Sequence, residues 1–90
     1  MPDLQTVLVP NPQCPVRQVK DGYIVMAASG ATYPFDGPAA LIWSQLDGSR
    51  DLAGILADIV ATYEVEPDVA QADLLDFADS LLAAGLVVEA

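Results

Sequence analysis

Residues 35–48, with the sequence FDGPAALIWSQLDG, predict how the second half of the chain begins to fold. Asp36 is a typical N-cap residue, Pro38 fits the first turn of a helix, and Gly48 stands just past the expected end. Four apolar residues follow the i, i+3, i+4, i+7 spacing of a helix with one buried face: Ala39, Ile42, Trp43 and Leu46. A helix this short is not stable alone, so it must pack against other elements.

Two further helices are predicted downstream. The second covers residues 52–63, with Ser49 or Asp51 as its cap and an apolar stripe along one face. The third begins with a proline at its first position and covers residues 67–84, and the glycine that follows is typical of a helix end. Residues 86–89 are expected to form a short strand or a tail.

The segment before the helices predicts a three-stranded antiparallel meander. Residues 16–20 and 23–27 flank Asp21 and Gly22, which form a two-residue hairpin signal. A second tight turn leads to a strand at residues 31–35, which continues into the first helix. The predicted fold is therefore α+β and winged-helix-like, a meander followed by three α-helices.

Residues 1–15 are interpreted as an N-terminal arm, and residues 16–90 as a single domain. The arm contains four prolines, and the sequence leaves its order open. Residues 4–9 have the composition of a strand, but Pro10 and Pro12 stop it.

Composition excludes several classes of function. The chain has 3 basic and 13 acidic residues, so its net charge of −10 opposes nucleic acid and anionic membranes. Cys14 is the only cysteine and histidine is absent, which excludes an internal disulfide and a Cys/His zinc cluster. Without a catalytic or phosphate-binding motif, we expect no enzyme activity, no metal and no cofactor. No apolar run approaches the about 20 residues of a membrane span, and no signal peptide is recognisable, so the expected location is the cytoplasm.

Pro34 indicates that the third strand lies at an edge of the sheet. Proline has no N–H group, so it occurs in strands at edges or ends. If Pro34 turns its backbone outward, Thr32 does too, because alternate residues of a strand point their backbone groups the same way. Such an edge is either shielded or used to bind another chain.

From Gly22 onward the chain resembles the PqqD-like family, the RiPP recognition elements, which bind the leader of a ribosomally made precursor peptide. The resemblance lies in the order and spacing of dispersed positions rather than in one motif. Gly54 stands where the family often has Glu, and Phe35-Asp36 stands where it often has Leu-Asn. The matching positions are residues 31–36, 39–43, 46–48, Leu52, Ile55, 62–65, Val69, 72–74, Phe77 and 84–87.

The resemblance implies that a leader adds as an extra strand to residues 31–35 and also touches the third helix. Its partner would be a peptide-modifying enzyme, such as a radical or cyclising enzyme or a leader protease. Asp73 and Asp76 would pair with a basic residue of the leader, although the flank of the helix that lines the groove stays open. The expected peptide-binding residues are Gly30, Ala31, Thr32, Tyr33, Pro34, Asp73, Asp76, Phe77 and Ser80.

Two other functions fit the same architecture. A winged-helix DNA-binding regulator needs basic residues on its recognition helix, and residues 67–84 contain none. A structural dimerisation module would use the same open edge against a second copy of the chain. We expect a monomer or a weak homodimer.

Overall fold

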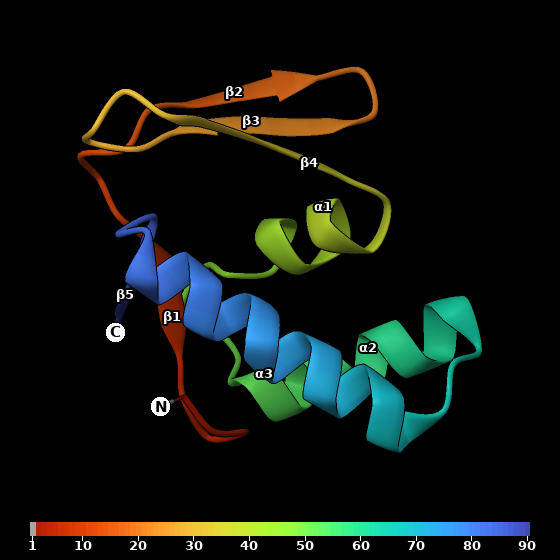
Figure 1. Cartoon of the computed structure of the whole chain (residues 1–90). Coiled ribbons are helices and arrows are strands. Elements are labelled where there is room, and N and C mark those ends of the chain that lie inside the picture. The colour runs from red at the N-terminus through yellow and green to blue at the C-terminus, as the bar shows by residue number, and fades with distance from the viewer. Residues whose placement is uncertain (1) are drawn as a thin grey trace.

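The computed structural model describes residues 2–90, and its α+β fold confirms the predicted meander and three helices (Figure 1). A second, two-stranded sheet adds to that prediction. The elements in chain order are β1 (Leu8–Pro10), β2 (Val16–Val19), β3 (Gly22–Met26), β4 (Thr32–Asp36), α1 (Gly37–Ser44), α2 (Leu52–Tyr63), α3 (Pro67–Ala83) and β5 (Val87–Glu89).

The meander is an antiparallel sheet in the order β2-β3-β4. Ile24 is the central residue of its middle strand, opposite Arg17 on β2 and Pro34 on β4. β3 and β4 approach closely at Gly22, where an added Cβ would lie 1.9 Å from the carbonyl oxygen of Phe35. Figure 1 shows the meander on one side of α1, with α2 and α3 on the other, and β4 running directly into α1.

The core lies between the meander and the three helices, and every helix buries part of its predicted apolar stripe. Val25 of β3 is completely buried, and Phe35 is the buried residue of β4. The buried helix and loop residues are Ile42, Trp43, Leu46, Leu52, Ile55, Ile59, Ala70, Leu74, Ala78 and Leu81. Because the stripes meet in one cluster, each helix is stabilised by its neighbours.

The start of α2 and the end of α3 agree with the sequence prediction, whereas the end of α1 differs from it. Asp51 caps α2, and its Oδ1 accepts a hydrogen bond of 3.0 Å from the backbone N–H of Gly54. Gly85 follows α3 with a φ of 74°, as expected for a C′ glycine. α1 is shorter than predicted, because its last turn tightens and the N–H of Gln45 bonds to the carbonyl of Ile42. Gly48 therefore lies in the loop beyond the helix rather than directly after it.

The N-terminal segment differs from the predicted arm, because the structure places β1 in the two-stranded sheet with β5. Leu8 pairs with Glu89 and is only 1% exposed, so it belongs to the core. The carbonyls of Leu4 and Thr6 accept hydrogen bonds from the first two N–H groups of α2, at 2.8 and 3.0 Å. These donors have no partner within their own helix. The boundary drawn at residue 15 thus separates residues that fold together.

Leu8 allows a direct test of this packing. Leu8→Ala should lower the free energy of unfolding by about 2–5 kcal/mol, because it removes buried methyl groups and leaves a cavity in the core. Val88→Ala in β5 is the control and should cost less than about 1 kcal/mol, since that side chain is 41% exposed. Urea denaturation followed by circular dichroism measures both. Equal effects of the two substitutions would show that Leu8 is not part of the core.

Gly54 should be replaceable with a gain in stability. It lies inside α2, and an added Cβ would come no closer than 3.4 Å to a neighbouring atom. Gly54→Ala should raise the free energy of unfolding by about 0.5–1 kcal/mol, because alanine loses less backbone entropy in a helix. Gly85→Ala, at positive φ, should instead lower it by about 1 kcal/mol. Thermal unfolding compares the two variants, and destabilisation by Gly54→Ala would contradict the open space around that position.

Candidate functional site

The free edge of β4 is the first component of the site. The N–H of Ala27 donates to the carbonyl of Ala31 at 2.8 Å, which makes these two residues a hydrogen-bonded pair. Because the pattern alternates along an antiparallel ladder, Tyr33 and Phe35 bond to β3. The backbone groups of Thr32 and Pro34 therefore point away from the sheet, the arrangement that Pro34 indicated. An N–H and two carbonyls are left open on this edge.

The first two residues of the predicted binding strand belong to the preceding turn instead. The N–H of Gly30 donates to the carbonyl of Ala27 at 2.9 Å, and a φ of 91° places Gly30 in the left-handed region. The carbonyl of Ala31 is occupied by the N–H of Ala27. The open edge consequently begins at Thr32, not at Gly30.

Aromatic packing connects this edge to α3. The Phe35 side chain points inward, and its ring centroid lies 5.5 Å from that of Trp43 on α1. The Phe77 ring of α3 also packs edge-on against Phe35, with centroids 5.4 Å apart and an interplanar angle of 86°. Offset and edge-on pairs at this distance are favourable. The three rings hold β4, α1 and α3 together.

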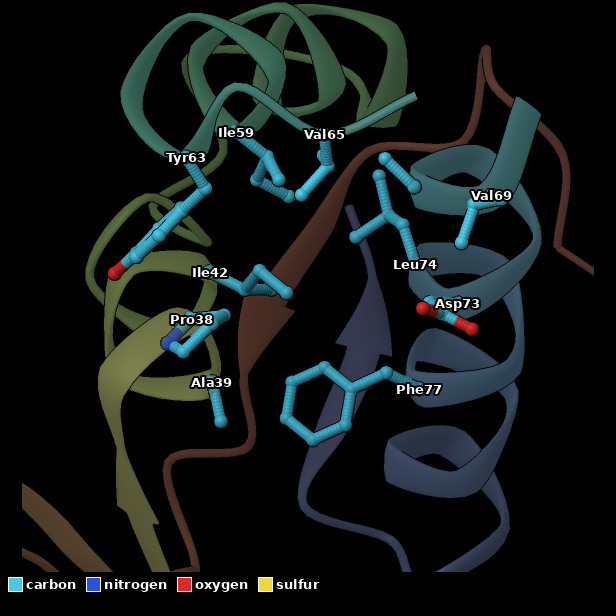
Figure 2. Close-up of a pocket in the computed structure, with 11 residues that line it drawn as sticks. Pro38, Ala39, Ile42, Ile59, Tyr63, Val65, Val69, Asp73, Leu74 and Phe77 are labelled. Carbon is cyan, nitrogen blue, oxygen red and sulfur yellow. The ribbon is translucent and has the colours of Figure 1, made fainter. Parts of the chain in front are cut away.

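An apolar pocket of about 420 Å³ lies between α1, the end of α2 and the first half of α3. Figure 2 shows the Phe77 ring extending from α3 toward Ala39 on α1, with Ile42 and Ile59 lining the space between the helices. The lining residues are Pro38, Ala39, Ile42, Ile59, Tyr63, Val65, Val69, Ala70, Asp73, Leu74 and Phe77. β4 leads into the first turn of α1, which is one wall of the pocket. The C-terminal end of the open edge therefore adjoins the pocket.

Exposed apolar side chains surround the opening of the pocket. Tyr63, Val65 and Val69 are 39%, 38% and 57% exposed, although they are large and apolar. A cluster of this kind on a small domain commonly marks a binding surface. The sequence prediction missed it, because Val65 and Val69 lie off the core stripe and only the turn between α2 and α3 brings them beside Tyr63.

The predicted residues of α3 are only partly brought together. Asp73 and Phe77 line the pocket, and Asp73 is the one charged side chain that does so. Ser80 follows on the same face by helical spacing, whereas Asp76 is turned further toward solvent, and neither lines the pocket. The pocket thus lies on the Asp73 flank of α3, and the flank that lines a peptide groove stays a prediction.

The charges near the site are negative. Arg17 and Lys20 lie on the β2–β3 hairpin, and Arg50 forms an ion pair with Asp58, so none of the three basic residues lines the pocket. Within residues 2–90, no group of three or more side chains is placed to hold a metal ion. The same part of the chain has no helix long and apolar enough to cross a membrane. What the site offers is backbone hydrogen bonding, an apolar cavity and one carboxylate at its wall.

Amide hydrogen exchange can test the orientation of the edge. Tyr33 and Phe35 should exchange slowly because their N–H groups bond to β3, whereas Thr32 and Asp36 should exchange quickly. Heteronuclear NMR spectra recorded after transfer to D2O give the four rates separately. Protection of Thr32 comparable to that of Tyr33 would mean that the edge is already covered.

Comparison with known proteins agrees with this geometry. The family described as "Coenzyme PQQ synthesis protein D (PqqD)" matches residues 22–87. That range includes the whole of β3, β4, the three helices and the pocket. No curated protein sequence matches the chain.

Two solved structures share the fold. "Lasso peptide synthetase B1 complexed with the leader peptide" has a TM-score of 0.80 and 25% identity, over 91% of this chain and 98% of the other. "TbiB1 in Complex with the TbiA(beta) Leader Peptide" has a TM-score of 0.80 and 22% identity, over 88% and 93% of the two chains. Because the family match covers most of the sequence and the fold agrees with these structures, the chain belongs to the PqqD family.

Proposed function

We propose that this chain is a peptide-binding module that captures the leader of a ribosomally made precursor by adding it as a strand to β4. The observation that carries the proposal is the open β4 edge directly beside an apolar pocket of about 420 Å³. Strand addition combines these two features, since main-chain hydrogen bonds supply affinity and side-chain pockets supply selectivity. The similar lasso peptide synthetase B1 was solved with a leader peptide, which supports the same class of ligand here.

The edge defines how a leader would pair. Thr32 offers both an N–H and a C=O, and Pro34 offers only a C=O, so pairing is strongest at Thr32. Asp36 has the next outward N–H, at the end of β4. A leader that continues past Asp36 reaches the pocket, where Ile42 and Phe77 would contact an apolar side chain. This arrangement would select leaders that have a large apolar residue at a fixed distance from the segment paired with β4.

The negative wall of the groove favours a basic leader. Asp73 stands at the pocket and Asp76 one turn of α3 further on, both exposed to solvent. Together with the net charge of −10, they would attract a leader that carries Lys or Arg and would speed its association.

The proposed role is non-catalytic, and the captured peptide would be presented to a modifying enzyme. Backbone groups, an apolar cavity and one carboxylate can bind and orient a peptide but provide no nucleophile with a matching base. DNA binding is not favoured, because α3 carries four aspartates and no basic residue. Self-association through the β4 edge would compete with the leader for the same groups.

Thr32→Pro tests the strand addition. It removes the outward N–H where the proposed pairing is strongest and should weaken leader binding by about 1–3 kcal/mol, because a buried partner on the peptide loses its hydrogen bond. Gln18→Pro is the matched control, since Gln18 turns its backbone outward on the opposite edge of the same sheet. Calorimetry with the cognate leader measures the affinity, and circular dichroism confirms folding. Unchanged affinity in a folded Thr32→Pro protein, with a loss in Gln18→Pro, would place the leader on β2.

Asp73→Asn tests the charge of the groove. It should lower affinity mainly at low salt and only for leaders with a nearby Lys or Arg, because exposed charge pairs are screened by ions. Asp76→Asn should have a smaller effect of the same sign. Asp79→Asn, an equal change of charge elsewhere on α3, should leave binding nearly unchanged. The test measures the affinity of each variant for the leader at two salt concentrations. Equal losses in all three variants would indicate a general effect of charge rather than a contact between Asp73 and the leader.

A further inference from the structure

Asp-Gly occurs three times in the chain, at residues 21–22, 36–37 and 47–48. This dipeptide is chemically reactive, because glycine has no side chain to shield its amide nitrogen from the aspartate carboxyl group. The nitrogen can attack the side-chain carbonyl carbon and close a five-membered ring. Ring closure requires a carboxyl group without hydrogen-bond partners, a glycine N–H that is not already bonded and a peptide unit that is free to rotate. The structure distinguishes the three dipeptides by these conditions.

The carboxylate of Asp47 is occupied. It accepts hydrogen bonds of 2.9 and 2.5 Å from the backbone N–H and the hydroxyl of Ser49. The hydroxyl bond and then the backbone bond lower the pKa of Asp47, so its protonated form is scarcer than that of an ordinary aspartate. The protonated form is the one that reacts, because it can lose its hydroxyl group as water. Gly48 also packs against β1, since an added Cβ would lie 2.9 Å from Cγ1 of Val9.

Gly22 is held between two strands. The N–H of Met26 donates to the carbonyl of Pro15 at 2.9 Å, so the alternation along the β2–β3 ladder makes Val19 and Gly22 a hydrogen-bonded pair. The nitrogen of Gly22 is therefore engaged. On its other side β4 lies so close that an added Cβ would clash with a carbonyl oxygen of that strand. The peptide unit between Asp21 and Gly22 cannot rotate without separating the strands.

Asp36 and Gly37 meet all three conditions. Asp36 is exposed at the N-cap of α1, and its side chain makes no capping hydrogen bond. The N–H of Gly37 is the first of α1 and has no acceptor in its own helix, and none is found elsewhere within residues 2–90. Gly37 has a φ of 54°, and an added Cβ would meet no atom within 4 Å. In Figure 1 this open segment is the bend between β4 and α1.

We propose that Asp36 is a site of spontaneous isomerisation to isoaspartate. The nitrogen of Gly37 forms a bond to Cγ of Asp36, the bond from Cγ to the carboxyl hydroxyl breaks, and the hydroxyl leaves as water with the amide proton. A second water molecule then opens the ring. Attack at Cγ restores aspartate, whereas attack at the α-carbonyl carbon breaks its bond to nitrogen and leaves the chain joined through the side chain. One water leaves and one enters, so the reaction needs no oxidant, cofactor or enzyme.

The isomer would change the junction between the two parts of the candidate site. It adds one carbon atom to the backbone between β4 and α1, which otherwise follow each other without a loop. Pro38 and Ala39, which line the pocket, would shift relative to the open edge of β4. The inference does not depend on the proposed function, because it concerns the covalent linkage of the chain and is measured without a leader.

Ageing the full chain in heavy-oxygen water tests the site. Each ring opening adds one heavy oxygen atom, and tandem mass spectrometry after digestion in ordinary water locates it. Trypsin cleaves after Lys20 and Arg50, so one peptide carries all three dipeptides and serves as its own control. The label should enter Asp36 at least about tenfold faster than Asp21 or Asp47, a difference of about 1.4 kcal/mol in the barrier. Equal labelling of the three residues, or faster labelling of another, would overturn the proposal.

Two variants test the structural reasons for this selectivity. Ser49→Ala removes a donor from the Asp47 carboxylate and should raise labelling at Asp47 without changing that at Asp36. Asp36→Ser keeps a typical N-cap residue, so its amide NMR spectrum should be the same before and after ageing. The spectrum of the unsubstituted chain should instead gain a second set of signals for residues 35–39. Unchanged labelling at Asp47 in Ser49→Ala, or the same new signals in aged Asp36→Ser, would contradict the assignment to a free Asp36 carboxyl group.

Discussion

The packing of Phe35 between Trp43 and Phe77 determines the geometry on which the site depends. The centroid distances of 5.5 and 5.4 Å place one ring from β4, one from α1 and one from α3 in a single cluster. Because β4 continues into α1 without a loop, any shift of Phe35 would move both the open edge and one wall of the pocket. The distance between the edge and α3 is thus set by Phe35 and Trp43, which are buried, together with Phe77, which also lines the pocket.

A second feature, the pairing of β1 with β5, stabilises the fold without using the β4 edge. The two ends of the described chain pair as β1 and β5, and Leu8 and Val87 from this small sheet are buried in the core. The same segment provides carbonyl partners for the first N–H groups of α2. The terminal sheet thus adds to the core that the helices and the meander form, while one edge of the meander stays unpaired. A domain of this size has little stability to spare, so this addition matters.

Local signals in the sequence were sufficient for most of the fold. Asp21-Gly22 indicated the hairpin, Asp51 and Pro67 indicated helix starts, and Pro34 indicated the outward edge. The pairing of β1 with β5 was missed because it joins two three-residue strands from opposite ends of the chain, and three residues are too few for a clear alternation. The role of Gly30 was also misread, since its N–H serves the turn.

The site was harder to predict than the fold. Asp73 and Phe77 were expected to bind peptide because the family resemblance pointed to α3; both line the pocket, and their binding role stays a prediction. The sequence did not indicate the other lining residues Ile59, Val65 and Val69. A pocket between three helices depends on how the helices are placed relative to one another. Helical periodicity shows which face of each helix is apolar, but not where two apolar faces pack incompletely and leave a pocket between them.

The most direct test of the account is a set of intermolecular NOEs between the isotope-labelled protein and its unlabelled cognate leader. The account predicts contacts from the Thr32 and Asp36 amides to the peptide backbone. It also predicts contacts from the Phe77 ring and the Ile42 methyl groups to one apolar side chain of the peptide. Backbone contacts to Val16 and Gln18 on β2, with none to Thr32, would contradict it.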